Sequence, residues 1–512
     1  MITRYLILFA TGMLGALILL ALQIFTRRRT LQEIVTASWL LLMVALWLVL
    51  PSEGRWTVSL WRPSAILGGQ LLMDMTPGVW QVGLALGLTF TGVVWVQVAD
   101  TRSALPLSGV VTVSTLLIVW LALTGGSLLT VLTAWSLFDL LWGGAGLIAI
   151  NDGERVTFGW LLNGLASIVL WTVALLLERE GGSTLWWLMV PSVPVEVLLT
   201  GAALLRIGLY PFHISFPRRI GDVDPLFLIS AMNPVLGLGL LYRVFSLPGA
   251  RAFPGWVAAF GAVTLVWGGL MAWRGHRAEV PVRASYALLG AIVAGGVTAG
   301  APALLLGGTA TWFAAQALLW LSRPRSRHDV VWSWPGLLAL LVLLGAPPSA
   351  LGALYRAALT GLGWGSRVVL FLGGVLVSVA LFRFGRRRTR ASVAPPWIWQ
   401  RLSLAVGLAL PLVALLCCVR VAPPSLLGML LWSATLLGAA AWVWWRKGRT
   451  FASERLDAIW PFFDLQWAHR SLWRGAEHVL GGVRIVAEVV EGSGAMLWSM
   501  LVILIVLLIR GS

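Results

Sequence analysis

The sequence predicts an all-α polytopic membrane protein with about sixteen transmembrane helices. Of the 512 residues, 59% are hydrophobic and only 11% are charged, against about 25% charged residues in a typical soluble domain. Apolar runs near the roughly 20 residues that cross a bilayer recur from Tyr5 to Ile509. Prolines interrupt two of these runs close to an arginine. The composition excludes a soluble enzyme, a secreted disulfide scaffold and a disordered protein.

Each predicted span is an apolar run of nearly bilayer length. Charged or turn-forming residues separate most of the runs from one another. In chain order the spans cover 5–26, 33–51, 77–98, 105–124, 127–150, 157–177, 193–212, 225–246, 255–273, 284–301, 303–321, 332–357, 367–384, 400–420, 424–445 and 493–509.

The basic residues predict an orientation. The chain has 37 lysines and arginines against 20 acidic residues, a net charge of +17. With the N-terminus outside, 26 basic residues fall in inward segments and 9 in outward ones, leaving Arg206 and Arg356 within spans. Cytoplasmic loops are enriched in arginine and lysine. The bias predicts a multi-pass protein of a bacterial-type inner (plasma) membrane with both termini outside. We therefore interpret the positive net charge as a property of cytoplasmic loops rather than as a sign of nucleic-acid binding.

Two segments between spans are predicted not to cross the membrane. Residues 52–76 form a polar, tryptophan-bearing outward segment. Residues 450–491 precede the last span, 493–509, and alternate aromatic residues with charges. This alternation is typical of an amphipathic helix on the membrane surface. It also fits a linker helix packed on the bundle.

Ionisable residues inside spans are costly in lipid and mark candidate functional sites. Asp139 lies near the middle of one predicted span and Arg206 near the middle of another, while Arg356 follows a proline break. The sequence leaves open whether Asp139 and Arg206 pair. No Cys/His cluster, nucleotide loop or flavin motif is present in the sequence. No metal, cofactor or catalytic site of the chain's own is therefore expected.

The interrupted helices predict an internal repeat. Proline removes an amide donor and breaks or kinks a helix, and broken backbone at membrane depth is buried in protein or lines a wet cavity. One broken helix in each half is typical of an inverted-repeat transporter, although prolines also simply kink membrane helices. The prolines concerned are Pro211, Pro217, Pro347 and Pro348.

The predicted organisation has two inverted five-helix repeats between flanking helices. Each repeat contains one of the broken helices, and the surface helix precedes the last span. The parts are 1–104 with helices 1–3, 105–246 as the first repeat with its break near 206–217, 255–384 as the second repeat with its break near 345–356, 400–445 with helices 14 and 15, 450–491 as the surface helix, and 493–509.

The first break carries a recognisable motif. Residues 206–217 read R-I-G-L-Y-P-F-H-I-S-F-P, followed by Asp224 and Pro225. This resembles the motif K-S-A-Q-x-P-x-H-x-W-L-P, followed by a T-P pair, of the antiporter-like membrane subunits. Those subunits translocate ions in proton-pumping NADH:quinone oxidoreductase (complex I), and their relatives occur in Mrp-type cation/proton antiporters and membrane-bound hydrogenases.

Weaker similarities follow in the family's order along most of the chain. Residues 71–75 are similar to the leucine-aspartate motif that opens the third helix, and 127–135 resemble the approach to the fifth. Residues 315–320 look like the F-K-A-L-L-F stretch, and 345–356 resemble the G-x-P-P-x-x-G motif. The surface helix before the last span also matches the longest family members.

The chain departs from the family at its protonatable positions. The lysine of the seventh helix is Arg206, the histidine position of the eighth holds Ala231, and the central lysine position holds Gln316. The fifth-helix glutamate is Ser136, with Asp139 about one turn on. The twelfth-helix lysine region, at or next to the expected place, offers Arg356. Arginine does not deprotonate in proteins, so a path through these positions lacks titrating members.

Three functions are compatible with these residues. In the first, the chain takes part in proton or cation translocation coupled to a redox partner, with Asp139 and His213 as the remaining titratable members of the path. His213 equally fits a hydrogen-bonding role at the helix break. The resemblance implies other membrane subunits as partners and a soluble redox arm in a redox-driven complex, such as an NADH:quinone oxidoreductase, to which any enzymatic activity would belong.

The second function is that of a degenerate, non-conducting scaffold subunit of such a complex, which the replaced lysines favour. The third is that of an unrelated membrane enzyme, such as a lipid-linked glycosyltransferase. That enzyme needs acidic residues on outward loops, and the predicted outward loops hold only scattered acids, among them Glu53, Glu178 and Glu180. The first two functions are therefore preferred.

Overall fold

The structure is a computed structural model of the chain, which divides into two units, Met1–Thr450 and Phe451–Ser512. All helices and strands named below belong to the first unit. The predicted surface helix (450–491) and last span (493–509) lie outside the described residues except for five positions. The described residues are 2–26, 28–57, 72–99, 108–149, 153–213, 225–248, 255–274, 279–322, 334–347, 349–386, 398–418, 426–445, 471, 474, 475, 478 and 481.

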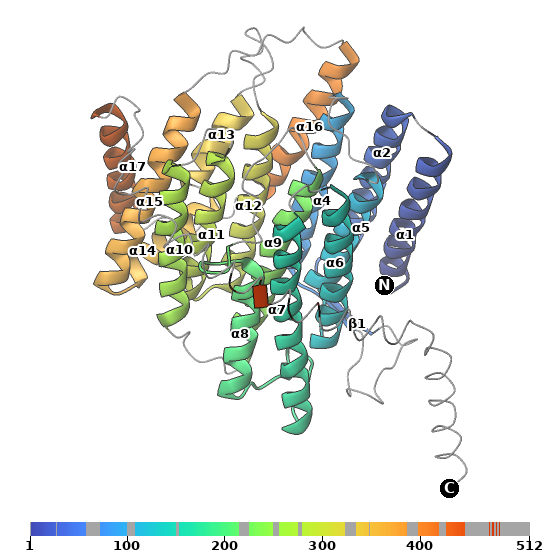
Figure 1. Cartoon of the computed structure of the whole chain (residues 1–512), viewed down its shortest axis with the longest axis horizontal. Coiled ribbons are helices and arrows are strands. Elements are labelled where there is room, and N and C mark those ends of the chain that lie inside the picture. The colour runs from blue at the N-terminus through green and yellow to red at the C-terminus, as the bar shows by residue number, and fades with distance from the viewer. Residues whose placement is uncertain are drawn as a thin grey trace. The chain divides into compact units, whose positions relative to one another are not determined.

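Long helices dominate the first unit (Figure 1). They are accompanied by a single pair of short strands among the described residues. The elements are α1 (Ile2–Phe25), α2 (Arg29–Leu48), β1 (Gly54–Thr57), β2 (Leu72–Met75), α4 (Pro77–Ala99), α5 (Ser108–Thr124), α6 (Leu128–Ala149), α7 (Gly153–Arg179), α8 (Val193–Ile207), α9 (Pro225–Phe245), α10 (Gly255–Arg274), α11 (Val280–Ala299), α12 (Pro302–Leu321), α13 (Trp334–Leu343), α14 (Ala350–Gly361), α15 (Trp364–Arg386), α16 (Ile398–Cys417) and α17 (Leu426–Trp445).

The all-α polytopic class is confirmed. Among the described residues, twelve helices are long and apolar enough to cross a membrane. Helices α5 and α13 are apolar but shorter. Each of the first fifteen predicted ranges coincides with a helix or, for 332–357, with the helix pair α13 and α14. The total of sixteen spans and the repeat boundaries stay predictions.

The small hairpin was not predicted. Strands β1 and β2 pair antiparallel, with Gly54 opposite Met75 and Thr57 opposite Leu72. Each strand has four residues, which is too short for an alternating pattern to stand out from the flanking apolar runs. The two strands lie within residues 52–76, the segment predicted to be polar, tryptophan-bearing and outward.

Polar side chains inside the helices bond to their own backbone. The hydroxyls of Thr89, Thr91 and Thr115 donate to the carbonyls four residues earlier, at 2.7 Å each. This pattern satisfies a buried hydroxyl without a second helix. Threonine therefore remains compatible with helices that are buried on nearly every side.

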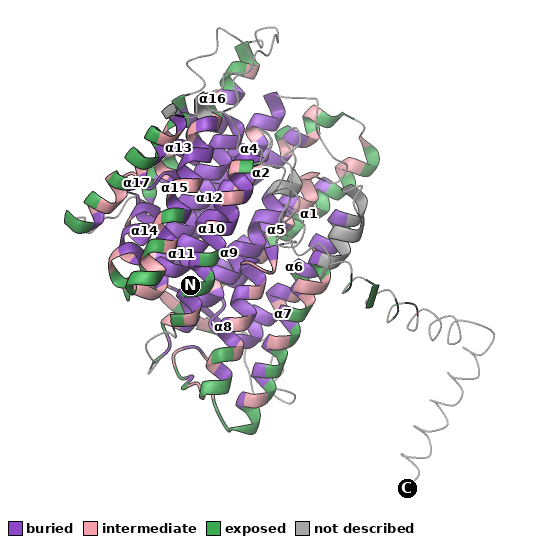
Figure 2. Cartoon of the chain, turned by 60° about the vertical axis from the view of Figure 1, so that its left-hand side comes forward, coloured by how far each residue is buried: buried purple, intermediate pink, exposed green. Residues whose placement is uncertain are grey.

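Burial is uneven across the helices. Most residues of α4, α11 and α12 are buried, whereas fewer than a third of those in α1 and α17 are. Figure 2 shows the buried residues gathered in the interior of the bundle. Close packing depends on small residues, since a Cβ at Gly290 of α11 would lie 2.2 Å from the Gly261 carbonyl oxygen of α10. Small residues let membrane helices approach closely.

At both predicted breaks a helix ends close to a glycine with positive φ. Helix α8 ends at Ile207 and is capped by Gly208 at φ +75°, and residues 209–213 that follow are not regular α-helix. Helices α13 and α14 are separated at Gly345, where φ is +83°. Ser349 caps α14 by accepting a hydrogen bond from the Gly352 amide at 3.1 Å. Pro211 and Pro347 lie in these breaks; Pro217 and Pro348 lie outside the described residues.

Candidate ion-translocation site

Asp139 and Arg206 form a buried ion pair. Arg206 Nη2 lies 2.7 Å from Asp139 Oδ1, and Arg206 Nη1 donates to Asp139 Oδ2 at 3.0 Å. Arg206 is fully buried, and Asp139 is 7% exposed. The question that the sequence leaves open is thus resolved: the two candidate residues are in direct contact.

Three helices hold this pair. Asp139 comes from α6 and Arg206 from the last turn of α8. Ser167 of α7 donates a hydrogen bond to Asp139 Oδ2 at 2.9 Å. The Asp139 carboxylate is therefore bonded from both neighbouring helices, which orients it within the bundle.

Aromatic rings enclose the guanidinium. Arg206 Cζ lies 4.5 Å from the ring centroid of Trp135 and 5.3 Å from that of Phe138. A cation over an aromatic face is attracted by the ring quadrupole. Trp135, Phe138 and Asp139 are on the same helix, so one stretch of α6 supplies both the counter-charge and the cover. The Arg206 Nε has no hydrogen-bond partner among the described residues.

In a buried ion pair, each charge compensates the other in the absence of water. Removing one partner leaves an uncompensated charge in a low-dielectric environment, at a cost of about 3–5 kcal/mol. Of the two, only the carboxylate gains or loses a proton, because the guanidinium stays protonated. The pair therefore has one titratable member and one permanent cation.

His213 lies in an aromatic cluster next to the first break. Its ring centroid is 5.6 Å from that of Tyr210 and 5.9 Å from that of Tyr286 on α11. Trp267 of α10 is 5.2 Å from Tyr210. The Tyr210 amide donates to the Thr264 hydroxyl at 3.1 Å. The segment that follows α8 thus contacts α10 and α11, two helices of the predicted second repeat.

Arg356 and Gln316 occupy separate places. Arg356 is buried in α14, and its Nη1 donates to the Gly345 carbonyl at the second break, 3.2 Å away. Gln316 is 1% exposed on α12, and neither atom of its amide has a hydrogen-bond partner among the described residues. The Arg356 guanidinium thus bonds at the second break, whereas Arg206 pairs with Asp139.

A second buried ion pair was missed by the sequence reasoning. Asp74 of β2 accepts from Arg243 Nη1 at 2.6 Å and from the more exposed Arg55 Nε at 3.2 Å. Arg243, in the last turn of α9, also donates to the carbonyls of Asp74 and Leu123. Asp74 is only 7% exposed, because the hairpin folds it against Arg243. A lone acid before a span and a lone arginine at a helix end were the available signals.

The described residues contain no group of three His, Cys, Asp or Glu side chains that would hold a metal ion. The charged groups at this site are the Asp139 carboxylate and the Arg206 guanidinium, and charged residues inside a membrane protein are candidates for ion pathways.

No family model and no curated protein matches the chain by sequence. Solved structures with a similar fold include three membrane complexes. A chain of the Mrp complex from Dietzia sp. DQ12-45-1b has a TM-score of 0.74 and 16% identity over 99% of this chain. This chain spans 63% of the length of that Mrp chain.

The other two similar chains belong to respiratory assemblies. A chain of respiratory complex I from Thermus thermophilus has a TM-score of 0.62 and 20% identity, covering 80% of this chain and 97% of its own. A chain of the membrane-bound sulfane sulfur reductase, an archaeal respiratory membrane complex, has a TM-score of 0.63 and 14% identity, covering 99% and 100%. The resemblance noted in the sequence is thus confirmed at the level of fold: the chain shares its fold with chains of the Mrp complex, respiratory complex I and the sulfane sulfur reductase.

Proposed function

We propose that the chain is an antiporter-like subunit of a respiratory or related membrane complex and takes part in proton or cation translocation coupled to a redox partner. The observation that carries the proposal is the Asp139–Arg206 ion pair, buried between α6, α7 and α8. The partners of the chain are other membrane subunits and, in a redox-driven complex, a soluble redox arm. The similar chains come from multi-subunit complexes, which supports this assembly.

The pair suits a charge-controlled switch. A proton that reaches Asp139 neutralises the carboxylate and weakens its hold on Arg206, which remains charged. The freed guanidinium then favours any neighbouring carbonyl, water or anion. Loss of the proton restores the pair. Asp139 is therefore the residue on which transport depends most. The hydrogen bond from Ser167 orients its carboxylate.

The test is ion flux with the charge removed. The chain is purified from native membranes with the subunits that accompany it, identified by mass spectrometry, and reconstituted in liposomes. Asp139→Asn is expected to reduce proton or cation flux at least tenfold. Glu178→Gln, which neutralises an exposed carboxylate at the end of α7, is the matched control and is expected to leave flux unchanged. Full flux in Asp139→Asn would contradict the proposal.

A non-conducting scaffold subunit is the second candidate. The replacements at three positions favour it, because the antiporter-like subunits that the chain resembles have protonatable residues there. These positions hold Arg206, Ala231 and Gln316. On this alternative, Asp139→Asn changes the stability of the complex without changing flux per assembled complex. Deletion of 450–491 is then expected to release neighbouring subunits, and intact assembly after that deletion would argue against the scaffold role.

A further inference from the structure

Arg356 differs from the two arginines that form buried ion pairs. Arg206 pairs with Asp139 and Arg243 with Asp74. Arg356, on α14, is only 4% exposed, yet no carboxylate in the described part of the chain pairs with it. Its guanidinium is a permanent cation. The bundle therefore encloses a positive charge at the second break for which the described residues provide no counter-charge.

The sequence around Arg356 offers no interior acid. None of the helices from α11 to α17 contains an aspartate or a glutamate. Between Glu279 and Glu454 the single acidic residue is Asp329, which lies in the arginine-rich connection between α12 and α13, outside the described residues. A charged group inside a membrane protein needs a partner, so the helices that surround Arg356 leave this need unmet.

The acceptors at the second break are already occupied. Three carbonyls that follow α13 each accept a hydrogen bond from a side chain. The pairs are Trp432 Nε1 with the Leu344 oxygen at 2.8 Å, Arg356 Nη1 with the Gly345 oxygen at 3.2 Å and Ser349 Oγ with the Ala346 oxygen at 2.7 Å. A helix C-terminus compensates a cation by about half a charge at most. The carbonyls at the break therefore balance the guanidinium only in part.

Hydrogen-bond donors at the break are in excess. Arg356 Nε has no partner among the described residues. Helix α14 begins at Ala350, and the first amides of a helix lack intrahelical acceptors. Ser349 satisfies the amide of Gly352. Arg356 Nη1 lies over this same turn, since a Cβ at Gly352 would be 3.0 Å from it. A guanidinium and a helix N-terminus at one place favour a bound anion.

The packing at the break favours a small anion. A Cβ at Gly352 would lie 2.2 Å from the Gly345 oxygen, and a Cβ at Gly345 would lie 3.2 Å from Trp432 Nε1. The two helix ends and α17 are thus in close contact. A phosphate that carries acyl chains is too large to reach a side chain as enclosed as Arg356, whereas a single inorganic ion is not.

We propose that the second break binds a small monovalent inorganic anion, chloride, between the Arg356 guanidinium and the N-terminus of α14. The anion supplies the missing counter-charge and links α14 to the end of α13. Its binding is independent of Asp139 and Arg206, so the proposal does not rest on ion translocation by that pair.

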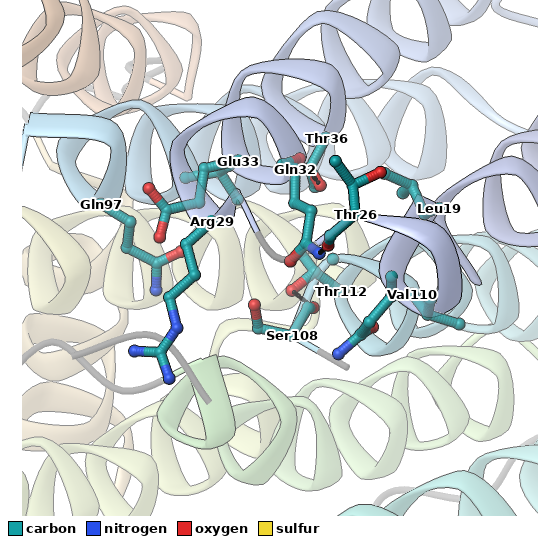
Figure 3. A pocket seen from close by; sticks show the side chains of 13 residues that line it. Leu19, Thr26, Arg29, Gln32, Glu33, Thr36, Gln97, Ser108, Val110 and Thr112 are labelled. Carbon is teal, nitrogen blue, oxygen red and sulfur yellow. Dashed lines mark hydrogen bonds between the residues drawn. The ribbon is translucent and has the colours of Figure 1, made fainter. Parts of the chain in front are cut away.

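An exposed arginine at the other end of the bundle provides a control. Arg29 lines a polar cavity of about 330 Å³ between the ends of α1 and α4 and the starts of α2 and α5 (Figure 3). Salt screens an exposed charge without occupying a specific site. Any chloride effect that arises from exposed arginines of this kind therefore persists when Arg356 is replaced.

The test measures chloride binding directly. The full chain with its accompanying subunits is purified in detergent, and radiolabelled chloride is titrated by equilibrium dialysis, with gluconate keeping the ionic strength constant. The wild type is expected to show a saturable site that bromide competes for and gluconate does not. Arg356→Gln is expected to weaken binding at least tenfold, equivalent to about 1.4 kcal/mol, whereas Arg29→Gln is expected to bind chloride as the wild type does.

A second variant supplies the counter-charge within the chain. Ala353→Glu places a carboxylate three residues before Arg356 on the same helix, a spacing that allows an ion pair. This variant is expected to lose chloride binding. An anion that binds only the folded state raises the unfolding temperature, so chloride is expected to raise that of the wild type and to leave that of Ala353→Glu unchanged. The result is informative even where Arg356→Gln folds poorly.

Three outcomes would overturn the proposal. The first is the absence of saturable chloride binding in the wild type. The second is wild-type affinity in a folded Arg356→Gln or in Ala353→Glu. The third is binding that disappears in Arg29→Gln but persists in Arg356→Gln, which would place the anion in the cavity of Figure 3 rather than at the second break.

Discussion

The guanidinium of Arg206 and the carboxylate of Asp139 meet through two nitrogen–oxygen contacts of 2.7 and 3.0 Å, although the residues are 67 positions apart in the chain. Both are shielded from solvent inside the bundle. In a membrane protein, an isolated charge at such a place has little water to stabilise it. Each residue therefore stabilises the buried charge of the other, and the energy of this coupling can be measured.

A double-mutant cycle is expected to show strong coupling between the two residues. Asp139→Leu and Arg206→Met are each expected to lower the free energy of unfolding by about 3–5 kcal/mol, because each leaves one buried charge uncompensated. The double variant removes both charges and is expected to lose much less than the two single losses together. Denaturant unfolding in detergent micelles measures the cycle. Additive losses would show that the pair is not coupled.

Replacing Arg206 by lysine is expected to change transport rather than assembly. The ammonium group still pairs with Asp139, but lysine readily loses its proton when buried, whereas arginine does not. If the chain translocates ions, Arg206→Lys raises proton flux and makes it depend on pH in a range where the wild type does not. Flux at several pH values in reconstituted liposomes tests this. Identical flux profiles for both proteins would favour the scaffold function.

The two arginines on Asp74 are expected to contribute very unequally. The side chain of Arg243 is 6% exposed, whereas that of Arg55 is 56% exposed. Arg243→Met leaves the buried carboxylate without its main partner and is expected to cost about 3–5 kcal/mol. Arg55→Met removes a solvated contact and is expected to cost less than about 1 kcal/mol. Thermal unfolding of the two variants in the same detergent compares their stabilities. Similar losses of stability in both variants would contradict the prediction.

Helix spacing provides a fourth prediction. In Gly290→Ala the new methyl group meets the Gly261 carbonyl of the neighbouring helix, so α10 and α11 must separate, at a cost of about 1–3 kcal/mol. Gly201 of α8 has open space around it. Gly201→Ala is therefore the matched control and is expected to be neutral or to stabilise by up to about 1 kcal/mol. The unfolding temperatures of the two variants test this prediction. An unchanged unfolding temperature in Gly290→Ala would show that the contact between α10 and α11 is not tight.

Much of the fold was predictable because hydropathy is a local property. A run of about 20 apolar residues has few stable alternatives to a helix in lipid, so α1, α4 and α15 appear where the sequence places them. The helix end at Gly208 and the break at Gly345 follow equally local signals, glycine and proline within otherwise apolar runs. The strands β1 and β2 escaped prediction because four residues carry too little pattern.

Sequence alone determined the membrane class, the helices, the breaks and the few charges that the membrane interior has to accommodate. Tertiary structure decided which charges meet: Asp139 with Arg206 and Asp74 with Arg243. Helices such as α4 and α12 are apolar on almost every side, so their periodicity does not indicate which face meets which neighbour. The partner of a buried charge depends on the rotation and contact of helices far apart in the chain, and these are settled only when the whole bundle packs.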